Sequence, residues 1–537
     1  MNQSPPLINY NLFSSDQTLQ ESTERESAAW AKESLLEFGK VLGSEEKIQQ
    51  GFQANDYPPL LKTHDRYGNR IDQIEFHPAW HEFMSLSVKF GLHGNPWKDP
   101  KPGAHVARAA MMILATQTEY GHLCPISMTY SVIPALRKEP NLAKVWEKKI
   151  LSNDYDPRFL PASEKKGLIF GMAMTEKQGG SDVRANTTRA TPIGNTGEYL
   201  ITGHKWFCSA PQSDGFLMLA QAPQGLTCFL VPRFKPDGSR NPFFIQRLKN
   251  KMANKSNASS EIELDQTWAH RVSEEGRGVA TIVEMVNHTR LDCVLGSTGL
   301  MRQALAQAIH HTQHRKAFGA LLKDHPLMKN VLADLSLESE AATLLAIRLA
   351  GAFDRSEDTA FEAPFRRIAT ALSKYWICKR TPSMIYEALE CFGGNGFIEE
   401  SMMPRLYREA PLNSVWEGSG NVISLDVVRA ALREPESLKA LLDEIERATG
   451  KNSSFDSYFS ALKKEGMNLF TEESLIRRNI ERLALALQAS LMLRYSIPEM
   501  SEAFCRSRLQ GDWHHCFGTL PSQIDFDAII QRAQPKL

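Results

Sequence analysis

The sequence predicts an α+β fold that is mostly helical, with a β-rich insert between helical regions. Residues 104–120 are rich in Ala, Met and Leu, which favour helix. From about residue 167 to 275, short runs of apolar, β-branched and aromatic residues are separated by Gly, Pro, Asn, Asp and Ser, a pattern typical of strands and turns. Helical patterning returns from residue 279. The predicted order is therefore helices, strands and helices again.

Two local signals place element boundaries in the second helical region, and a third indicates how one of its helices packs. Leu327, Val331 and Leu335 recur at a spacing of four behind Pro326, which predicts a helix that starts near that proline. Pro435 disfavours helix at the residue before it and marks a boundary. Beyond it, 475–495 is apolar on nearly every face, which indicates a helix packed on several sides. We expect four domains: 1–165 helical, 166–276 β-rich, 277–434 helical, and 435–537 helical.

Composition excludes several classes of protein. Of the 537 residues 42% are hydrophobic, and 62 Lys+Arg balance 62 Asp+Glu, so the overall charge gives no attraction to polyanions. No apolar run approaches the length of a transmembrane helix and the N-terminus lacks a signal peptide, so we expect a soluble, cytoplasmic protein. The eight cysteines form no CxxC pair, which favours reduced thiols and no metal site.

The first chemistry-bearing segment is MAMTEKQGGSDV, residues 172–183. A strand-like run ends near Thr175 and leads to Gly179, Gly180 and Ser181. Adjacent glycines allow backbone N–H groups to approach a phosphate or a ring edge, and the hydroxyls can bond to heteroatoms. The same pattern is also that of an ordinary hairpin turn.

The second segment, GHKWFCSAPQSD, places two aromatic residues, Trp206 and Phe207, at the end of a strand beside Ser209. An aromatic ring in that position suits stacking on a planar cofactor, and it equally suits the core of a β-sandwich.

The third segment, NSVWEGSGN, contains one acid, Glu417, between Trp416 and a Gly-Ser-Gly loop. Partial desolvation in such a place raises the pKa of a carboxyl group and suits a general base. A solvated loop carboxylate is the alternative.

Together, in order and spacing, these segments resemble the acyl-CoA dehydrogenase family of FAD flavoproteins. The flavin-binding turn resembles MTEKQGGSD, the flavin-side strand resembles GHKWFCS, and the catalytic-base loop resembles Trp416-Glu417-Gly418-Ser419. HRKAFG and ECFGGNGF are similar to the motifs that reach the FAD of a neighbouring subunit. The resemblance implies a helical domain, a β-barrel domain and a helical bundle, with Glu417 as the base. It implies these cofactor-binding residues: Met172, Ala173, Met174, Thr175, Gly179, Gly180, Ser181, Trp206, Phe207, Cys208, Ser209, Arg315, Phe318, Gly393, Gly394, Trp416, Gly418, Ser419 and Asn421.

Within that family the whole chain is most similar to the AidB branch, flavoproteins of the adaptive response to DNA alkylation, which also carries an extra C-terminal helical unit. The resemblance implies FAD, a homo-oligomer, with a tetramer expected, and protection of DNA with weak dehydrogenase activity. The alternatives are a genuine acyl-CoA dehydrogenase that passes electrons to an electron-transfer flavoprotein, and a non-catalytic, flavin-stabilised DNA-binding protein.

The AidB resemblance also implies a double-stranded DNA surface in the C-terminal unit, although its charges nearly balance. Arginines before and within that unit are the candidates for a local patch, namely Arg429, Arg506 and Arg508. The alternative is that such arginines pair with neighbouring glutamates on solvated helix faces.

Overall fold

The computed structural model describes residues 2–512 and 514–536, and the chain divides into two compact units. The first unit comprises residues 1–45, 101–117 and 290–537, and the second comprises residues 46–100 and 118–289.

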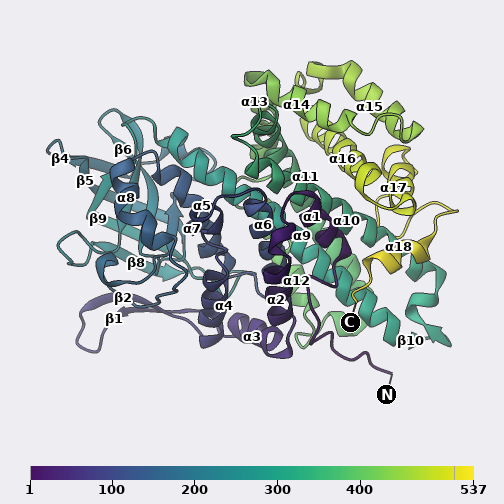
Figure 1. Ribbon diagram of the computed structural model, residues 1–537. Helices are drawn as coiled ribbons and strands as arrows, with labels where there is room; N and C mark the ends of the chain where they lie inside the picture. The colour runs from purple at the N-terminus through teal and green to yellow at the C-terminus, as the bar shows by residue number, and fades with distance from the viewer. Residues whose placement is uncertain (1, 513, 537) are drawn as a thin grey trace. The chain divides into compact units, whose positions relative to one another are not determined.

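The second unit is built on a seven-stranded sheet that closes on itself (Figure 1). β6, β4, β5, β9 and β7 pair in that order, and β7 pairs back to β6, which completes the ring. β3 adds to β6 in parallel and β8 adds to β9. The closed ring confirms the expected β-barrel. Its strands are β3 (Phe170–Ala173), β4 (Arg189–Ile193), β5 (Glu198–Ser209), β6 (Gly215–Ala222), β7 (Gly225–Pro232), β8 (Phe243–Leu248) and β9 (Ser259–Arg271).

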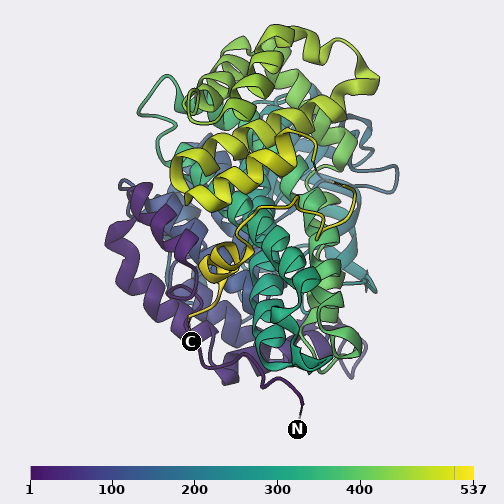
Figure 2. The same cartoon turned by 90° about the vertical axis from the view of Figure 1, so that its right-hand side faces the viewer.

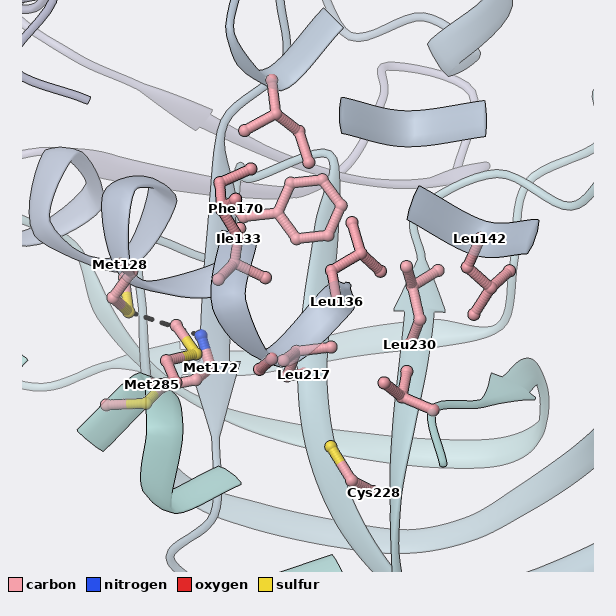
Figure 3. Packing of buried hydrophobic residues seen from close by; sticks show 14 of the residues in the cluster. Met128, Ile133, Leu136, Leu142, Phe170, Met172, Leu217, Cys228, Leu230 and Met285 are labelled. Carbon is pink, nitrogen blue, oxygen red and sulfur yellow. Dashed lines mark hydrogen bonds between the residues drawn. The ribbon is translucent and has the colours of Figure 1, made fainter. Parts of the chain in front are cut away.

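Side-chain alternation along β3 gives the barrel unit two apolar cores. Ala173 packs in the barrel interior with Phe216 and Phe229. Its neighbour Met172 points to the other face, into a cluster with Met128 and further residues of the helices that cover that side (Figure 3). The helices of this unit are α3 (Glu45–Asp56, counted from residue 46), α4 (Pro78–Lys89), α5 (Asn95–Lys98), α7 (Leu123–Leu136), α8 (Pro140–Ile150) and the start of α9 (Gly278–His314, counted to residue 289).

One element departs from the helical expectation for residues 1–165. β1 (Leu60–His64) and β2 (Arg70–Glu75) form an antiparallel hairpin. Its turn is set by Asp65, whose carboxylate accepts hydrogen bonds from the backbone N–H groups of Tyr67 and Asn69, and by Gly68, whose φ of +83° suits a residue without Cβ. Local turn chemistry therefore overrides the helical texture of the surrounding sequence.

The first unit is almost entirely helical, and its long helices α10 and α11 run through its centre (Figure 2). α10 begins at Pro326, α13 ends at Arg433 and α14 begins at Pro435, so the boundary predictions from proline positions are confirmed. Its elements before residue 435 are α1 (Gln17–Arg25), α2 (Lys32–Leu42), α6 (Ala104–Thr118, of which residues to 117 belong here), α9 (Gly278–His314, from residue 290), β10 (Lys316–Ala317), β11 (Ala320–Leu321), α10 (Pro326–Asp354), α11 (Glu362–Glu390), α12 (Met403–Glu409) and α13 (Gly420–Arg433).

The helices after residue 435 belong to the same unit and do not stand apart as a separate body. α16 is buried along most of its length, which confirms the prediction of a helix packed on several sides. A buried ion network joins these helices to the rest: Arg348 of α10 bonds to both Glu362 and Glu444. They are α14 (Pro435–Glu446), α15 (Ser453–Glu465), α16 (Ile476–Tyr495), α17 (Pro498–Phe504) and α18 (Phe526–Ala533).

Among residues 2–512 and 514–536, no helix combines the length and the apolar character needed to cross a membrane.

Candidate active site

The segment that carries Glu417 is a short loop between a 3₁₀ turn, Leu412–Ser414, and the start of α13. Glu417 is half-buried and has a φ of +57°, in the left-handed region that side chains other than glycine seldom adopt, and Gly418 follows with a φ of +105°. A non-glycine residue stays in that region only where the surroundings hold it there.

Two cations hold this loop by its backbone. Lys374 of α11 donates from Nζ to the carbonyl oxygens of Trp416 (2.9 Å) and Gly418 (2.7 Å). Arg290 of α9 donates from Nε to the carbonyl oxygen of Glu417 (3.1 Å). Three consecutive carbonyl groups around the candidate base are therefore fixed by side chains from two other helices.

The Trp416 side chain is held by a polar chain beneath the loop. Its indole Nε1 donates to Asn413 Oδ1 (2.8 Å), and Asn413 Nδ2 donates to Ser297 Oγ (3.1 Å). Asn413 and Ser297 are fully buried, so these hydrogen bonds act without competition from water. The orientation of the Trp416 side chain is thus set by Asn413 and, through it, by Ser297.

Arg290 is itself anchored by Asp426 of α13, at 2.7 Å. Burial opposes ionisation of Asp426, but Arg290 and Arg367 outweigh burial and hold the pKa of this carboxyl group below its ordinary value. Asp426 therefore remains an anion that fixes the direction of Arg290.

In the second unit, the turn after β3 is fixed to β5. The backbone N–H of Trp206 donates to the Thr175 carbonyl (2.8 Å), and the buried ammonium of Lys205 pairs with the buried carboxylate of Glu176 (2.9 Å). Burial alone would raise the pKa of Glu176, but Lys205 and the hydrogen bonds at Thr187 and Thr188 lower it to about 2. The ion pair ties the base of the glycine turn to the strand that carries the aromatic pair.

The glycine turn itself is open. Gly179 has a φ of +130° and no atom lies within 4 Å of where a Cβ would stand, whereas a Cβ on Gly180 would lie 2.5 Å from Thr175 Oγ1. Gly180 and Ser181 are exposed. The space beside Gly179 suits close approach by a ligand.

The aromatic pair at the end of β5 lies beside a cation. Lys249 Nζ is 3.4 Å from the ring centroid of Trp206 and 4.6 Å from that of Phe207. Phe207 is 52% exposed, a large exposure for an aromatic ring on a barrel strand. Cys208 next to it is fully buried, and burial raises the pKa of its thiol to about 12, so this thiol is inert.

The remaining predicted cofactor residues fall into two groups. The side chains of Met172 and Ala173 lie in the apolar cores, which leaves only their backbone for a ligand. The others are accessible to a ligand from solvent. Met174, Ser209 and Arg315 are half-buried, and the exposed residues are Phe318, Gly393, Gly394, Ser419 and Asn421.

The three candidate DNA-binding arginines are placed differently. Arg429 is exposed on α13 and its guanidinium also bonds to Asp426, while Arg506 is half-buried in the π-helical turn Cys505–Leu509. Arg508 is 5% exposed and donates to two buried carboxylates of α10. Because its guanidinium is committed inside the protein, Arg508 does not present a charge to a phosphate.

Comparison with known proteins places these features in a family. The pattern of the adaptive response protein AidB N-terminal domain matches residues 2–157, that of the acyl-CoA dehydrogenase middle domain matches 171–267, and that of the acyl-CoA dehydrogenase C-terminal domain matches 276–432. The putative acyl-CoA dehydrogenase AidB of Escherichia coli K12 is 43% identical over 95% of this chain and 94% of its own length. The chain belongs to the acyl-CoA dehydrogenase family.

Acyl-CoA dehydrogenase family member 11 of Caenorhabditis elegans is 30% identical over 80% of this chain and 71% of its own length. The crystal structure of C. elegans ACDH-11 in complex with C11-CoA superimposes with a TM-score of 0.87, at 26% identity, over 97% of this chain and 94% of that one. The AidB-like assignment, the acyl-CoA dehydrogenase fold and an FAD-dependent oxidoreductase are therefore confirmed.

The residues present fit an FAD cofactor. The open space at Gly179, the exposed ring of Phe207 and the cation Lys249 beside it offer a close backbone approach, a stacking surface and a positive charge. At the motif expected to reach a neighbour's cofactor, Gly393 and Gly394 likewise have no atom within 4 Å of the place that a Cβ would occupy. A flat, anionic cofactor suits such surfaces.

Sequence reasoning missed the side chains that hold the site. Lys374, Arg290 and Lys249 were not singled out, although Lys374 leaves a signal: it is a lysine within ATALSKYWIC, an otherwise apolar and small-residue stretch of helix. A charge in such a stretch indicates a buried partner, but only the structure identifies which backbone it holds.

Among residues 2–512 and 514–536, no three His, Cys, Asp or Glu side chains are arranged to hold a metal ion, and none of the eight cysteines is part of a disulfide.

Proposed function

We propose that this protein catalyses the α,β-dehydrogenation of an acyl-CoA thioester, with Glu417 as the base. The observation that carries the proposal is the loop geometry: a half-buried carboxylate in a left-handed backbone conformation, fixed by Lys374 and Arg290. Such preorganisation suits a group that must meet one particular proton.

In the proposed reaction the Glu417 carboxylate removes the proton from the α-carbon. The β-hydrogen leaves with its electron pair to FAD, which supplies the two-electron acceptor when it is bound. A C=C double bond forms between the α- and β-carbons, and Glu417 holds the abstracted proton until solvent or a second base takes it. The thioester oxygen requires hydrogen-bond donors as charge develops, and the backbone N–H of Glu417 is the donor that this chain would contribute.

The residues that would hold FAD are the glycine turn and the aromatic strand end of the second unit, with Thr175, Gly179, Trp206 and Phe207 at their centre. Arg315 and the Gly393-Gly394 turn would serve the cofactor of a neighbouring subunit, which requires an oligomer; a homotetramer is proposed. Light scattering of the FAD-loaded protein should give the tetramer mass, and a monomer that keeps FAD would contradict this arrangement.

An anaerobic titration with saturated acyl-CoAs of graded length tests the proposal. Because the C. elegans relative was crystallised with C11-CoA, the series should span C4 to C16 and include C11. Loss of oxidised-flavin absorbance with one acyl class, and none in Glu417→Gln protein that retains FAD, is the expected result. No bleaching by any acyl-CoA in fully FAD-loaded protein would refute dehydrogenation. An electron-transfer flavoprotein is the proposed electron acceptor.

A second function is favoured by the 43% identity with E. coli AidB and by the match to the adaptive response protein AidB N-terminal domain. In this proposal the protein protects DNA against alkylation and its dehydrogenase activity is weak. Arg429 and Arg506 are the remaining candidates for phosphate contacts. If Glu417 does no chemistry at all, this proposal becomes that of a non-catalytic, flavin-stabilised DNA-binding protein.

Duplex binding measured by fluorescence anisotropy over a salt series separates these functions. Sequence-independent binding that weakens steeply with salt supports a DNA role, because phosphate contacts release counterions. Absence of binding at low salt removes it. Glu417→Gln protein that still protects alkylated cells would assign protection to binding alone.

A further inference from the structure

The loop of Glu417 is held by a buried lysine that pairs with no carboxylate in the described part of the chain. Lys374 is 1% exposed and lies in the middle of α11, and no described carboxylate lies within 4.0 Å of its Nζ. Its ammonium donates to the Trp416 and Gly418 carbonyl oxygens. An unpaired ammonium in the interior is costly, and a leucine or methionine would pack there at lower cost if only stability mattered.

We propose that Lys374 is a positioning residue for Glu417: it holds the backbone on both sides of the base and keeps a positive charge next to the loop that carries it. The inference rests on the proposed role of Glu417 as the base. It goes beyond that role because it assigns both the geometry and the ionisation of Glu417 to one side chain of α11.

The geometric half of the inference follows from the two acceptors. Lys374 bonds to the residues immediately before and after Glu417, so the carbonyl groups at either end of the left-handed residue are fixed to a rigid helix. Arg290 fixes the carbonyl between them. Without Lys374, the Glu417 backbone would relax toward a right-handed or extended conformation, and its carboxylate would no longer point in its present direction.

The electrostatic half follows from the charges that face the loop. The cations Arg290, Lys374, Lys379 and Arg477 are set against the carboxylate of Asp426, and Asp426 is already shared by Arg290, Arg367 and Arg429. Burial, followed by repulsion from Arg477 and Lys374, lowers the pKa of Lys379, as expected where positive charge is in excess. The titratable and charged groups packed around the loop are Arg290 and Cys293 of α9, Lys374, Cys378 and Lys379 of α11, Asp426 of α13 and Arg477 of α16.

This excess of positive charge favours the carboxylate form of Glu417, the form that accepts a proton. Removal of the Lys374 charge should therefore raise the pH at which Glu417 becomes deprotonated in the free enzyme. A substitution that merely loosened the fold would slow the reaction without moving that pH.

Three variants of the FAD-loaded protein separate the two halves. Lys374→Met removes both the donor and the charge, and Lys374→Gln keeps a donor, on a side chain one atom shorter, without the charge. Lys149→Met is the matched control, because Lys149 also donates to two backbone carbonyl groups, those of Ala162 and Ser163, but in the other unit.

The first measurement is hydrogen–deuterium exchange by mass spectrometry over peptides that cover residues 412–424, and it needs no substrate. In Lys374→Met we expect amide exchange in this loop to rise about tenfold with the rest of the first unit unchanged; Lys374→Gln should rise less, and the control should not change there. Unchanged exchange in Lys374→Met would overturn the positioning role.

The second measurement is the pH dependence of flavin bleaching at low concentrations of the best acyl-CoA. The acidic limb should move upward by about one pH unit in Lys374→Met and Lys374→Gln, and stay in place in the control. A slower rate with an unmoved limb in Lys374→Gln would overturn the electrostatic role, including where Lys374→Met fails to fold. If no acyl-CoA bleaches the wild-type flavin, dehydrogenation fails as the proposed function, while the exchange measurement still decides whether Lys374 holds the loop.

Discussion

Removal of one partner from the buried pair of Glu176 and Lys205 should destabilise the barrel unit strongly, and the structure indicates the size of the effect. Both side chains are fully buried, and Lys205 Nζ also donates to the Leu219 carbonyl oxygen (2.8 Å). Lys205 and the neighbouring hydrogen bonds bring the pKa of Glu176 from an ordinary 4.5 to about 2, against the opposing effect of burial. A difference of about 2.5 pH units corresponds to about 3 kcal/mol of stabilisation at neutral pH from the ionisation of Glu176 alone. Burial lowers the pKa of Lys205, so the ion pair as a whole contributes less than this figure.

Glu176→Gln tests this figure, because the amide keeps the shape of the side chain and leaves Lys205 without a counter-ion. We expect the free energy of unfolding at pH 7, measured by urea denaturation followed by tryptophan fluorescence, to fall by about 3 kcal/mol. The added substitution Lys205→Met should recover part of the loss, since it removes the unpaired charge.

The pH dependence has a definite sign. Because the folded-state pKa of Glu176 is depressed, its contribution is complete above about pH 4.5 and is lost as the pH falls toward 2. The difference between wild type and Glu176→Gln should therefore shrink over that range. The control is Glu147→Gln, which breaks a partly exposed pair with Arg137 and should cost less than about 1 kcal/mol. A loss of under about 1 kcal/mol in Glu176→Gln, equal to that of the control, would refute the reasoning.

Three further predictions concern the glycine turn, the buried Arg508 and the accessibility of two cysteines. Gly179→Val should lower the flavin-to-protein ratio of the purified protein several-fold, because a side chain would fill the open turn. The control is Gly68→Val, which is also at positive φ with no atom within 4 Å of its Cβ position and should leave the ratio unchanged. Equal ratios in both variants would contradict the assignment of the turn to FAD binding. Arg508→Met should lower the free energy of unfolding by about 3 kcal/mol, seen as a lower Tm, because it leaves Asp334 and Glu338 partly unpaired. It should not change the salt dependence of any duplex binding, and a shallower salt slope would show that Arg508 contacts phosphate. At pH 8 a thiol reagent should label exposed Cys516 rapidly and Cys208 only on unfolding, because burial raises the Cys208 pKa to about 12; fast labelling of Cys208 in the native protein, located by peptide mapping, would contradict its burial.

The sequence by itself determined the features that depend on local pattern. Strand texture between residues 167 and 275 indicated the β-rich insert, and the positions of Pro326 and Pro435 indicated helix starts, because proline fixes φ and lacks a donor wherever it stands. The family followed from ordered motifs, since a glycine turn, an aromatic strand end and a glutamate loop are each encoded by a few consecutive residues. The hairpin at residues 60–75 was missed because its short turn signal lies between longer segments whose sequence favours helix.

Only the tertiary structure decided which side chains hold the site and which charges face solvent. Lys374 and Arg290 lie 44 and 127 residues from the loop carbonyls that they hold, and no short-range pattern encodes a contact across such a separation. Arg508 reads as part of a cationic cluster in the sequence, yet packing carries it into the interior against a carboxylate 174 residues away. Charge is a property of the residue, whereas its exposure and its partner are fixed by long-range packing, because burial and pairing depend on elements that meet only when the chain has folded.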